Sequence, residues 1–168
     1  MEQSNLWPEA AAKLWPQVER VARENGLILG SPAAAECITT ECLTESAEDW
    51  WDQWLAACSP SCEFEFLAVH YYGCSVSDLK SMLDRYAAKY GKPIWVTEVS
   101  CPSDSEDEEV EFLKKTLNML DTHPDVQRYA WFSTRTDGWL GTTPSLLGPD
   151  LQRVTRLGQI YNQAPKTK

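Results

Sequence analysis

A glutamate placed directly after an apolar segment is the sharpest candidate for chemistry in this sequence. Glu98 ends the run Pro93-Ile94-Trp95-Val96-Thr97-Glu98. A carboxylate at the end of a buried strand is partly desolvated and held in place, so it could attack the anomeric carbon of a sugar and form a covalent glycosyl-enzyme intermediate. The alternative is a strand-end glutamate that caps the next helix or pairs with an arginine, and spacing alone favours that alternative.

Aromatic and histidine side chains follow two other apolar segments. His70, Tyr71 and Tyr72 end one of them and could hydrogen-bond sugar hydroxyls and orient a nucleophile; the alternative is a half-exposed aromatic strand end. Trp131 ends the other and could stack on a pyranose ring or fill the core. Trp139 lies in a loop, where a large aromatic side chain is less often part of the core. It could instead form a stacking platform for a sugar ring.

The elements that must position these residues alternate in type. Apolar spacings of three and four predict helices over 8–25, 46–58, 77–90, 104–121 and 151–161. Short apolar runs predict strands over 27–32, 65–72, 93–97 and 128–133. Pro16 must kink the first helix or restart it, because it lacks an amide donor. The cadence is that of βα units in a parallel sheet, whose C-terminal strand ends line an active site when the sheet closes into a barrel.

The composition excludes several classes of function. The 168 residues carry 15 Lys and Arg against 25 Asp and Glu, and this net charge of -10 argues against broad binding to nucleic acid or to anionic membranes. No apolar run approaches the roughly 18 residues that span a bilayer. No strand is followed by a Gly-rich phosphate loop, which argues against nucleotide binding.

Metal sites are also weighed against simpler alternatives. The acidic residues of 104–109 resemble a calcium cluster, but they more simply begin a helix, where the macrodipole stabilises negative charge. The six cysteines lack the tight Cys/His pairs of zinc sites. We therefore predict no metal site, and glycoside hydrolysis by paired carboxylates would need neither a metal nor an organic cofactor. Trp50, Trp51 and Trp54 have helical spacing and are expected to pack in the core.

An even number of scattered cysteines is typical of secreted, disulfide-bonded proteins. The opening residues, however, show neither the basic nor the apolar region of a signal peptide. Either the natural N-terminus lies upstream, or the thiols stay reduced in the cytosol.

Several stretches together resemble glycoside hydrolase family 128. They are Phe66-Leu67-Ala68-Val69-His70-Tyr71-Tyr72-Gly73, then 90–98, then Tyr129-Ala130-Trp131-Phe132-Ser133, with 3–6, 8–11 and 14–16 at the start. Members of that family are β-1,3-glucanases with a (β/α)8-type barrel. The resemblance implies an α/β fold of parallel βα units, forming the C-terminal half (strands 5–8) of a TIM-type barrel. Residues 1–163 would be a partial catalytic domain, and 164–168 a tail.

The resemblance also implies roles for residues. Glu98 maps to the nucleophile of a retaining mechanism, and His70, Tyr71, Tyr72, Trp131 and Trp139 are the candidate substrate-binding residues on β-1,3-glucan. The family's acid/base glutamate belongs to an Asn-Glu-Pro motif that this sequence lacks. Glu2, beside Gln3, lacks the flanking Asn and Pro, so the role is not carried over to it.

Without an acid/base group, this chain alone is expected to be inactive or weak. The alternatives are a non-catalytic glucan-binding remnant of the fold and a truncated product with a structural role or none. The open half-barrel predicts self-association through exposed apolar surface and unpaired strand edges. An upstream N-terminus would imply an extracellular or cell-wall location. Strand numbering from the resemblance places Cys74 and Cys101 at one rim and predicts their disulfide, with Cys58–Cys62 and Cys37–Cys42 as local pairs.

Overall fold

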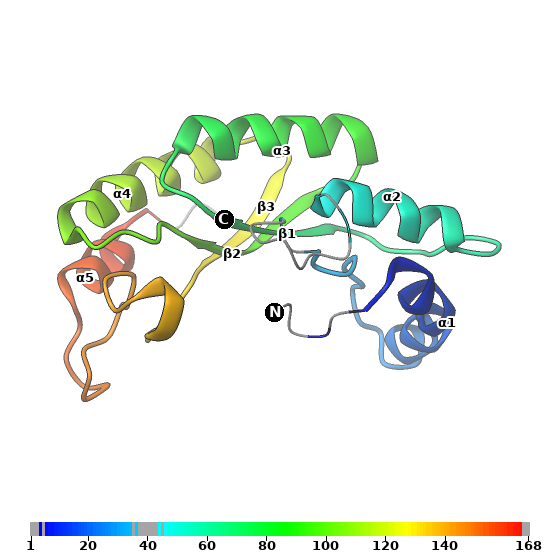
Figure 1. Cartoon of the computed structure of the whole chain (residues 1–168), viewed down its shortest axis with the longest axis horizontal. Helices are drawn as coiled ribbons and strands as arrows, with labels where there is room; N and C mark the ends of the chain where they lie inside the picture. The colour runs from blue at the N-terminus through cyan, green and yellow to red at the C-terminus, as the bar shows by residue number, and fades with distance from the viewer. Residues whose placement is uncertain (1–3, 5, 35, 37–43, 45, 166–168) are drawn as a thin grey trace. The chain divides into compact units, whose positions relative to one another are not determined.

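A computed structural model describes residues 4, 6–34, 36, 44 and 46–165, which form two compact units, Met1–Val69 and His70–Lys168. In chain order the elements are α1 (Pro8–Glu24), α2 (Ala47–Ala57), β1 (Leu67–Tyr72), α3 (Val76–Tyr90), β2 (Ile94–Ser100), α4 (Glu106–Thr122), β3 (Val126–Trp131), the 3-10 helix η1 (Gly138–Leu140) and α5 (Arg156–Gln163) (Figure 1). The boundary between the units falls inside β1, between Val69 and His70. The sheet has the order β1-β2-β3, and β2 and β3 pair in parallel, so the predicted α/β class with parallel strands is confirmed.

Aromatic packing forms the core of the first unit. Trp15 of α1 meets Trp54 of α2 edge-on at 4.9 Å between ring centroids, and Trp54 contacts Phe64 at 5.6 Å. Trp51 is also buried, and its indole N–H donates to the Pro32 carbonyl at 2.8 Å. The helical tryptophans are therefore packing residues, as their spacing predicts. Pro16 lies inside α1, which continues through it as one helix.

The strand predicted over 27–32 is replaced by two isolated parallel bridges, Gly30↔Phe66 and Ala34↔Val69. Two features explain the difference. The Leu29 amide donates to the Glu65 carboxylate at 2.7 Å instead of to a backbone carbonyl. Pro32 has no amide to donate. Among the described residues the sheet therefore has three named strands, and the four-stranded half-barrel is not reproduced.

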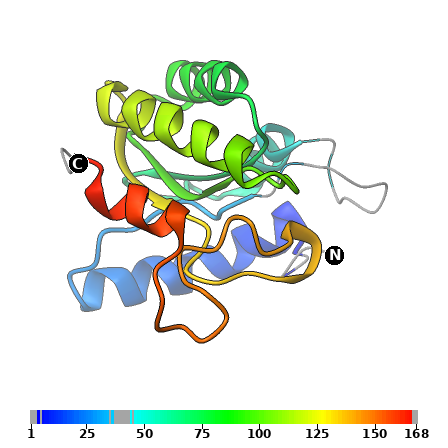
Figure 2. The same ribbon diagram turned by 90° about the vertical axis from the view of Figure 1, so that its left-hand side faces the viewer.

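In the second unit, helix caps follow from the sequence. Ser75 accepts from the Asp78 amide and begins α3, and Ser105 accepts from the Glu108 amide and begins α4. Gly91 ends α3 in the left-handed conformation, where a Cβ would be unfavourable. Both helices lie over the same face of the sheet (Figures 1 and 2). Their apolar sides supply fully buried residues to the core, among them Leu79, Leu83, Leu113 and Leu120.

The last helix starts later than the sequence predicts, at Arg156 instead of residue 151. The cause is a turn in front of it. The Asp150 carboxylate accepts from the amides of Gln152 and Arg153, and Leu151 has a φ of 58°. Thr155 then caps the helix by accepting from the Gly158 amide at 3.0 Å.

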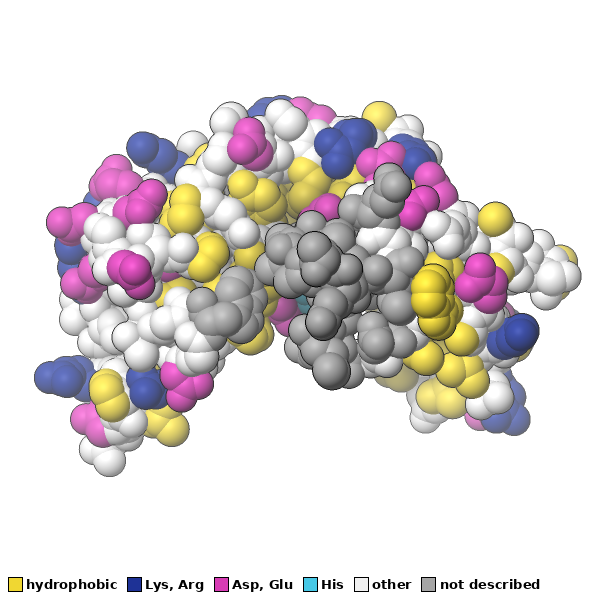
Figure 3. Space-filling model, viewed as in Figure 1, with side chains coloured by type: hydrophobic (Ala, Val, Ile, Leu, Met, Phe, Trp, Pro, Cys, Tyr) yellow, Lys and Arg dark blue, Asp and Glu magenta, His cyan; other side chains and the backbone are white. Residues whose placement is uncertain are grey.

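The surface of the first unit carries apolar side chains over α1 and the segment after it (Figure 3). Leu14, Val18, Val21, Leu27 and Ile28 are exposed, and the last four of them line an open apolar depression. Within the described ranges, no helix combines the length and the apolar character needed to cross a membrane.

Candidate functional site

A β-bulge in β2 decides where the Glu98 side chain points. Along β2, Ile94 and Val96 are fully buried, and strict alternation would place Glu98 on their face. The register with β3 shifts here, because Val96 pairs with Tyr129 while Val99 pairs with Trp131. One extra residue on β2 therefore lets Val99 resume the buried face and turns Glu98 away from it. Bulges often re-aim a side chain in this way beside active sites.

His70 and Tyr72 of β1 meet the Glu98 carboxylate. His70 Nδ1 lies 3.3 Å from Glu98 Oε2, and both side chains are 20% exposed. The Tyr72 hydroxyl donates a hydrogen bond to the same oxygen. The two residues are separated by one position on a strand, so they share a face. These are the partners of Glu98 within the described part of the chain, and the structure brings together three of the six predicted site residues.

The Tyr72 phenol is held in its neutral form, in which its hydroxyl can donate a hydrogen bond to Glu98. Burial, followed by the hydrogen bond to the Glu98 carboxylate and its negative charge, raises the pKa of the phenol well above its ordinary value near 10. The ring of Phe132 packs edge-on against Tyr72 at 5.9 Å between centroids. The Tyr72 hydroxyl therefore stays protonated and oriented at any physiological pH.

Tyr71 points elsewhere, although the sequence groups it with its two neighbours. Its hydroxyl donates to the Ser75 carbonyl at 2.8 Å, and its ring stacks on Phe112 of α4 at 6.4 Å. Alternation along β1 explains the split, because Tyr71 faces the side opposite to His70 and Tyr72. The period-2 rule applied to the sequence would have separated it.

The two predicted sugar platforms are not brought to Glu98 by any described contact. Trp131 is 6% exposed, its indole N–H donates to the Pro144 carbonyl at 2.9 Å, and its ring contacts Phe112. These contacts are those of a packed side chain, the alternative that its sequence position leaves open. Trp139 lies in η1, and its side chain is outside the described set. The sequence did not predict the role of Phe132, which packs against Tyr72. The sequence feature that could have indicated it is its position near the end of the 129–133 segment.

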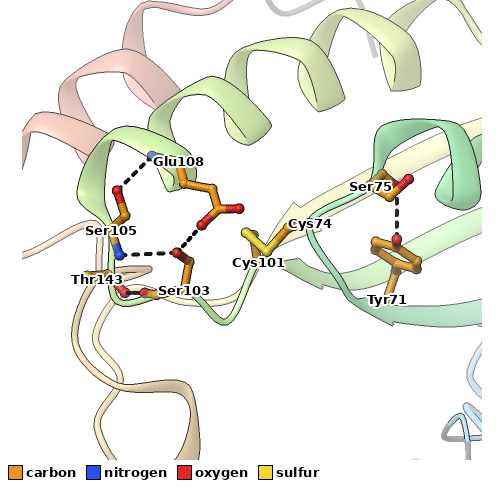
Figure 4. Close-up of a disulfide and its surroundings, with 8 residues drawn as sticks. All are labelled: Tyr71, Cys74, Ser75, Cys101, Ser103, Ser105, Glu108 and Thr143. Carbon is orange, nitrogen blue, oxygen red and sulfur yellow. Dashed lines mark hydrogen bonds between the residues drawn. A yellow bond between two sulfur atoms is a disulfide. The ribbon is translucent and has the colours of Figure 1, made fainter.

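Two predicted disulfides are present among the described residues. Cys58 is bonded to Cys62, and Cys74 is bonded to Cys101, with 5.4 and 4.6 Å between their Cα atoms. The Cys37–Cys42 pair lies outside the described residues. Cys74–Cys101 joins the segments that leave β1 and β2 (Figure 4). Glu98 lies near the end of β2, three residues before Cys101.

Metal ligands are not gathered at this edge. No group of three or more His, Cys, Asp or Glu that could hold a metal ion occurs within the residues that the structure describes. The acidic residues at the start of α4 lie in its first turn, where the helix dipole stabilises them. The chemistry that the arrangement offers is that of a carboxylate held by a hydrogen bond from a tyrosine and by a neighbouring histidine ring.

Comparisons with known proteins identify the family to which the chain is similar. A family model described as "Glycosyl hydrolase catalytic core" matches residues 1–161. Alkali-sensitive linkage protein 1 of Schizosaccharomyces pombe is 33% identical over 161 residues, which are 90% of this chain and 28% of that protein. An endo-β-1,3-glucanase of glycoside hydrolase family 128 (subgroup II) from Sorangium cellulosum superposes with a TM-score of 0.89 at 37% identity, covering 99% of this chain and 66% of that one.

A second glucanase structure includes an oligosaccharide. The subgroup I endo-β-1,3-glucanase of Amycolatopsis mediterranei, solved as a mutant in complex with laminaripentaose, has a TM-score of 0.77 at 27% identity and covers 97% of this chain and 67% of that one. The chain thus spans about two thirds of the length of these glucanases. The matched family model extends over nearly the whole chain, and we conclude that this chain belongs to the glycosyl hydrolase catalytic core family, with β-1,3-glucanases of glycoside hydrolase family 128 as its structural neighbours.

Proposed function

We propose that this chain carries the nucleophile side of a retaining β-1,3-glucan hydrolase. The observation that supports the proposal most is the Glu98 carboxylate, released from the buried face by the bulge and held by His70 and Tyr72. Both described partners contact Oε2, which leaves Oε1 to attack the anomeric carbon. The new Oε1–C1 bond forms as the C1–O bond of the leaving group breaks, and the electron pair leaves with that oxygen.

The described contacts of Glu98 do not include an acid/base carboxyl. A retaining mechanism needs a second carboxyl about 5–5.5 Å from the nucleophile, and loss of general acid catalysis lowers the rate by roughly 10²–10⁴-fold. We therefore expect weak hydrolysis of unactivated glucan by this chain alone. A glucan-binding module without catalysis is the second candidate, because the described partners of Glu98 are a histidine and a tyrosine and not a second carboxylate.

The same proposal extends to the architecture. Residues 1–163 are part of a TIM-type barrel, corresponding to its strands 5–8, with 164–168 as a tail. The apolar side chains exposed over α1 support this, because further polypeptide would cover them. Self-association through the open half-barrel stays a prediction.

The substrate and location follow from the relatives and the cysteines. We place β-1,3-glucan as the substrate, with Tyr71, Trp131 and Trp139 kept as predicted contacts. The two disulfides support an extracellular or cell-wall location, because such bonds persist in oxidising compartments.

A substrate with a good leaving group tests the nucleophile without the missing acid. The full chain is mixed with 2,4-dinitrophenyl β-laminaribioside, whose phenolate departs without protonation. We expect about one equivalent of phenolate in a burst and then slow turnover, because no base activates water to hydrolyse the intermediate. Mass spectrometry should find the sugar on the peptide that contains Glu98.

Matched variants decide between the candidates. Glu98→Gln should abolish the burst, while Glu111→Gln, which changes an exposed carboxylate on α4, should leave it intact. Binding of laminari-oligosaccharides without any burst would favour the non-catalytic module. Neither binding nor burst would reject both functions for this chain.

A further inference from the structure

The Cys74–Cys101 disulfide lies just beyond the Tyr72–Glu98 hydrogen bond, two residues after Tyr72 and three after Glu98. Cys74 follows the last residue of β1, Tyr72, by two positions, and Cys101 directly follows the last residue of β2, Ser100. Both strands leave the sheet at this edge. On the other side of β2, the bulge at Thr97 and Glu98 interrupts the regular pairing with β3. On the β3 side, Glu98 is therefore not fixed by a continuous ladder, while β2 pairs with β1 on its other side.

Each half of the disulfide belongs to a segment with its own internal bonds (Figure 4). On the β1 side, the Tyr71 hydroxyl donates to the Ser75 carbonyl, and the Ser75 side chain caps α3. These bonds shape the turn through Cys74. They do not join it to β2.

The segment after β2 is bound separately. Ser103 donates its hydroxyl proton to the Glu108 carboxylate and accepts from the Ser105 amide at 3.1 Å. The Thr143 hydroxyl donates to the Ser103 carbonyl. The turn after β1 and the loop after β2 are thus each held internally, and the disulfide is the covalent link between them.

We propose that the Cys74–Cys101 disulfide is a positioning element of the Glu98 site, which holds the end of β1 against the end of β2 and so keeps the Tyr72 hydroxyl on the Glu98 carboxylate. Its two sulfurs differ in access. Cys101 is fully buried, whereas Cys74 is exposed, so a reductant reaches the bond from the Cys74 side. Opening the bond releases one turn from the other without removing any side chain of the site.

The test reads Tyr72 directly and does not depend on hydrolysis. The full chain is labelled at tyrosine Cζ with ¹³C, and Tyr72→Phe assigns one of the six tyrosine resonances. In the wild type, Glu98 is the titratable group found in contact with the phenol among the described residues, and we expect Tyr72 to ionise only well above the range of an ordinary tyrosine. In Cys74→Ala/Cys101→Ala, the Tyr72 resonance should shift, and Tyr72 should ionise at a lower pH than in the wild type because the hydrogen bond to Glu98 is lost.

The second disulfide gives a matched control. Cys58→Ala/Cys62→Ala removes an equivalent bond in the other unit and should leave the Tyr72 resonance and its ionisation unchanged. If the Cys74→Ala/Cys101→Ala protein does not fold, mild reduction of the folded Cys58→Ala/Cys62→Ala protein provides the same comparison. An unchanged Tyr72 resonance after either loss of the Cys74–Cys101 bond would overturn the proposal.

Activity supplies a separate readout, which rests on the proposed function. If the nucleophile proposal holds, loss of the Cys74–Cys101 bond should slow the dinitrophenolate burst at saturating substrate, with the concentration for half-maximal rate unchanged. A burst that is absent in the wild type rejects the function but not the positioning, because the tyrosine resonance reports Tyr72 and Glu98 by itself.

Discussion

Glu109 makes the stability of the second unit depend on pH in an unusual direction. It lies in the first turn of α4 with no exposed surface. Burial raises its pKa to about 7, and the charge of Glu108 adds to this, while the backbone amides of Ser103 and Cys101 act in the opposite sense. The folded protein therefore holds this proton more tightly than the unfolded chain does.

The sign and size of the effect follow from linkage. Between pH 4.5 and pH 7 the unfolded chain has released the proton that folded Glu109 keeps, so the stability falls as the pH rises through this window. Below this pH window Glu109 is protonated in both the folded and the unfolded protein, and above the window it is ionised in both. A pKa that rises from 4.5 to about 7 corresponds to a loss of about 3 kcal/mol across the window.

Substitution by glutamine removes the ionisation and keeps the shape of the neutral acid. We expect Glu109→Gln to gain about 3 kcal/mol relative to the wild type between pH 5 and pH 8. The assay is urea unfolding followed by circular dichroism at several pH values, with each transition fitted separately. Glu106→Gln, an exposed substitution in the same helical turn, should run parallel to the wild type. If the Glu109→Gln and wild-type stabilities keep a constant difference across the window, the buried-acid argument is refuted.

Two further perturbations test the packing and the crosslinks. Removing the Cys74–Cys101 bond, which spans 27 positions, should cost about 3.5 kcal/mol on chain-entropy grounds, against about 2 for Cys58–Cys62, which spans 4. Equal losses in urea unfolding of the two double Cys→Ala variants would contradict that scaling. Leu113→Ala empties a fully buried site on α4 and should destabilise by about 2–5 kcal/mol in the same assay. A loss below about 1 kcal/mol would mean that the surrounding side chains collapse into the space.

Local signals predicted much of the fold. The caps Ser46, Ser75 and Ser105 each accept from the amide three residues on, and Gly91 ends α3, so those helix ends are readable from side-chain chemistry. The start of α5 was missed because the Asp150 turn in front of it also fits a helix start by composition.

The site was predicted less completely than the helices. Glu98, His70 and Tyr72 were predicted because they follow apolar runs, and the structure places them in contact. What joins them is the bulge in β2, which depends on pairing with Tyr129 and Trp131 of β3 and leaves no mark in the local pattern. Burial of Trp131 under the Pro144 carbonyl is likewise set by a loop thirteen residues away.

Because of the bulge, some residues of β2 serve core packing while Glu98 serves the site. The core contains the fully buried side chains of Ile94, Val96 and Val99, where the loss of a methyl group lowers the stability of the fold. The bulge displaces Glu98 from their face, and its described side-chain contacts are with His70 and Tyr72. Position 98 can therefore take a carboxylate, an amide or a small residue with little change in the packing of the sheet. Such substitutions alter the chemistry of the site and leave the fold in place.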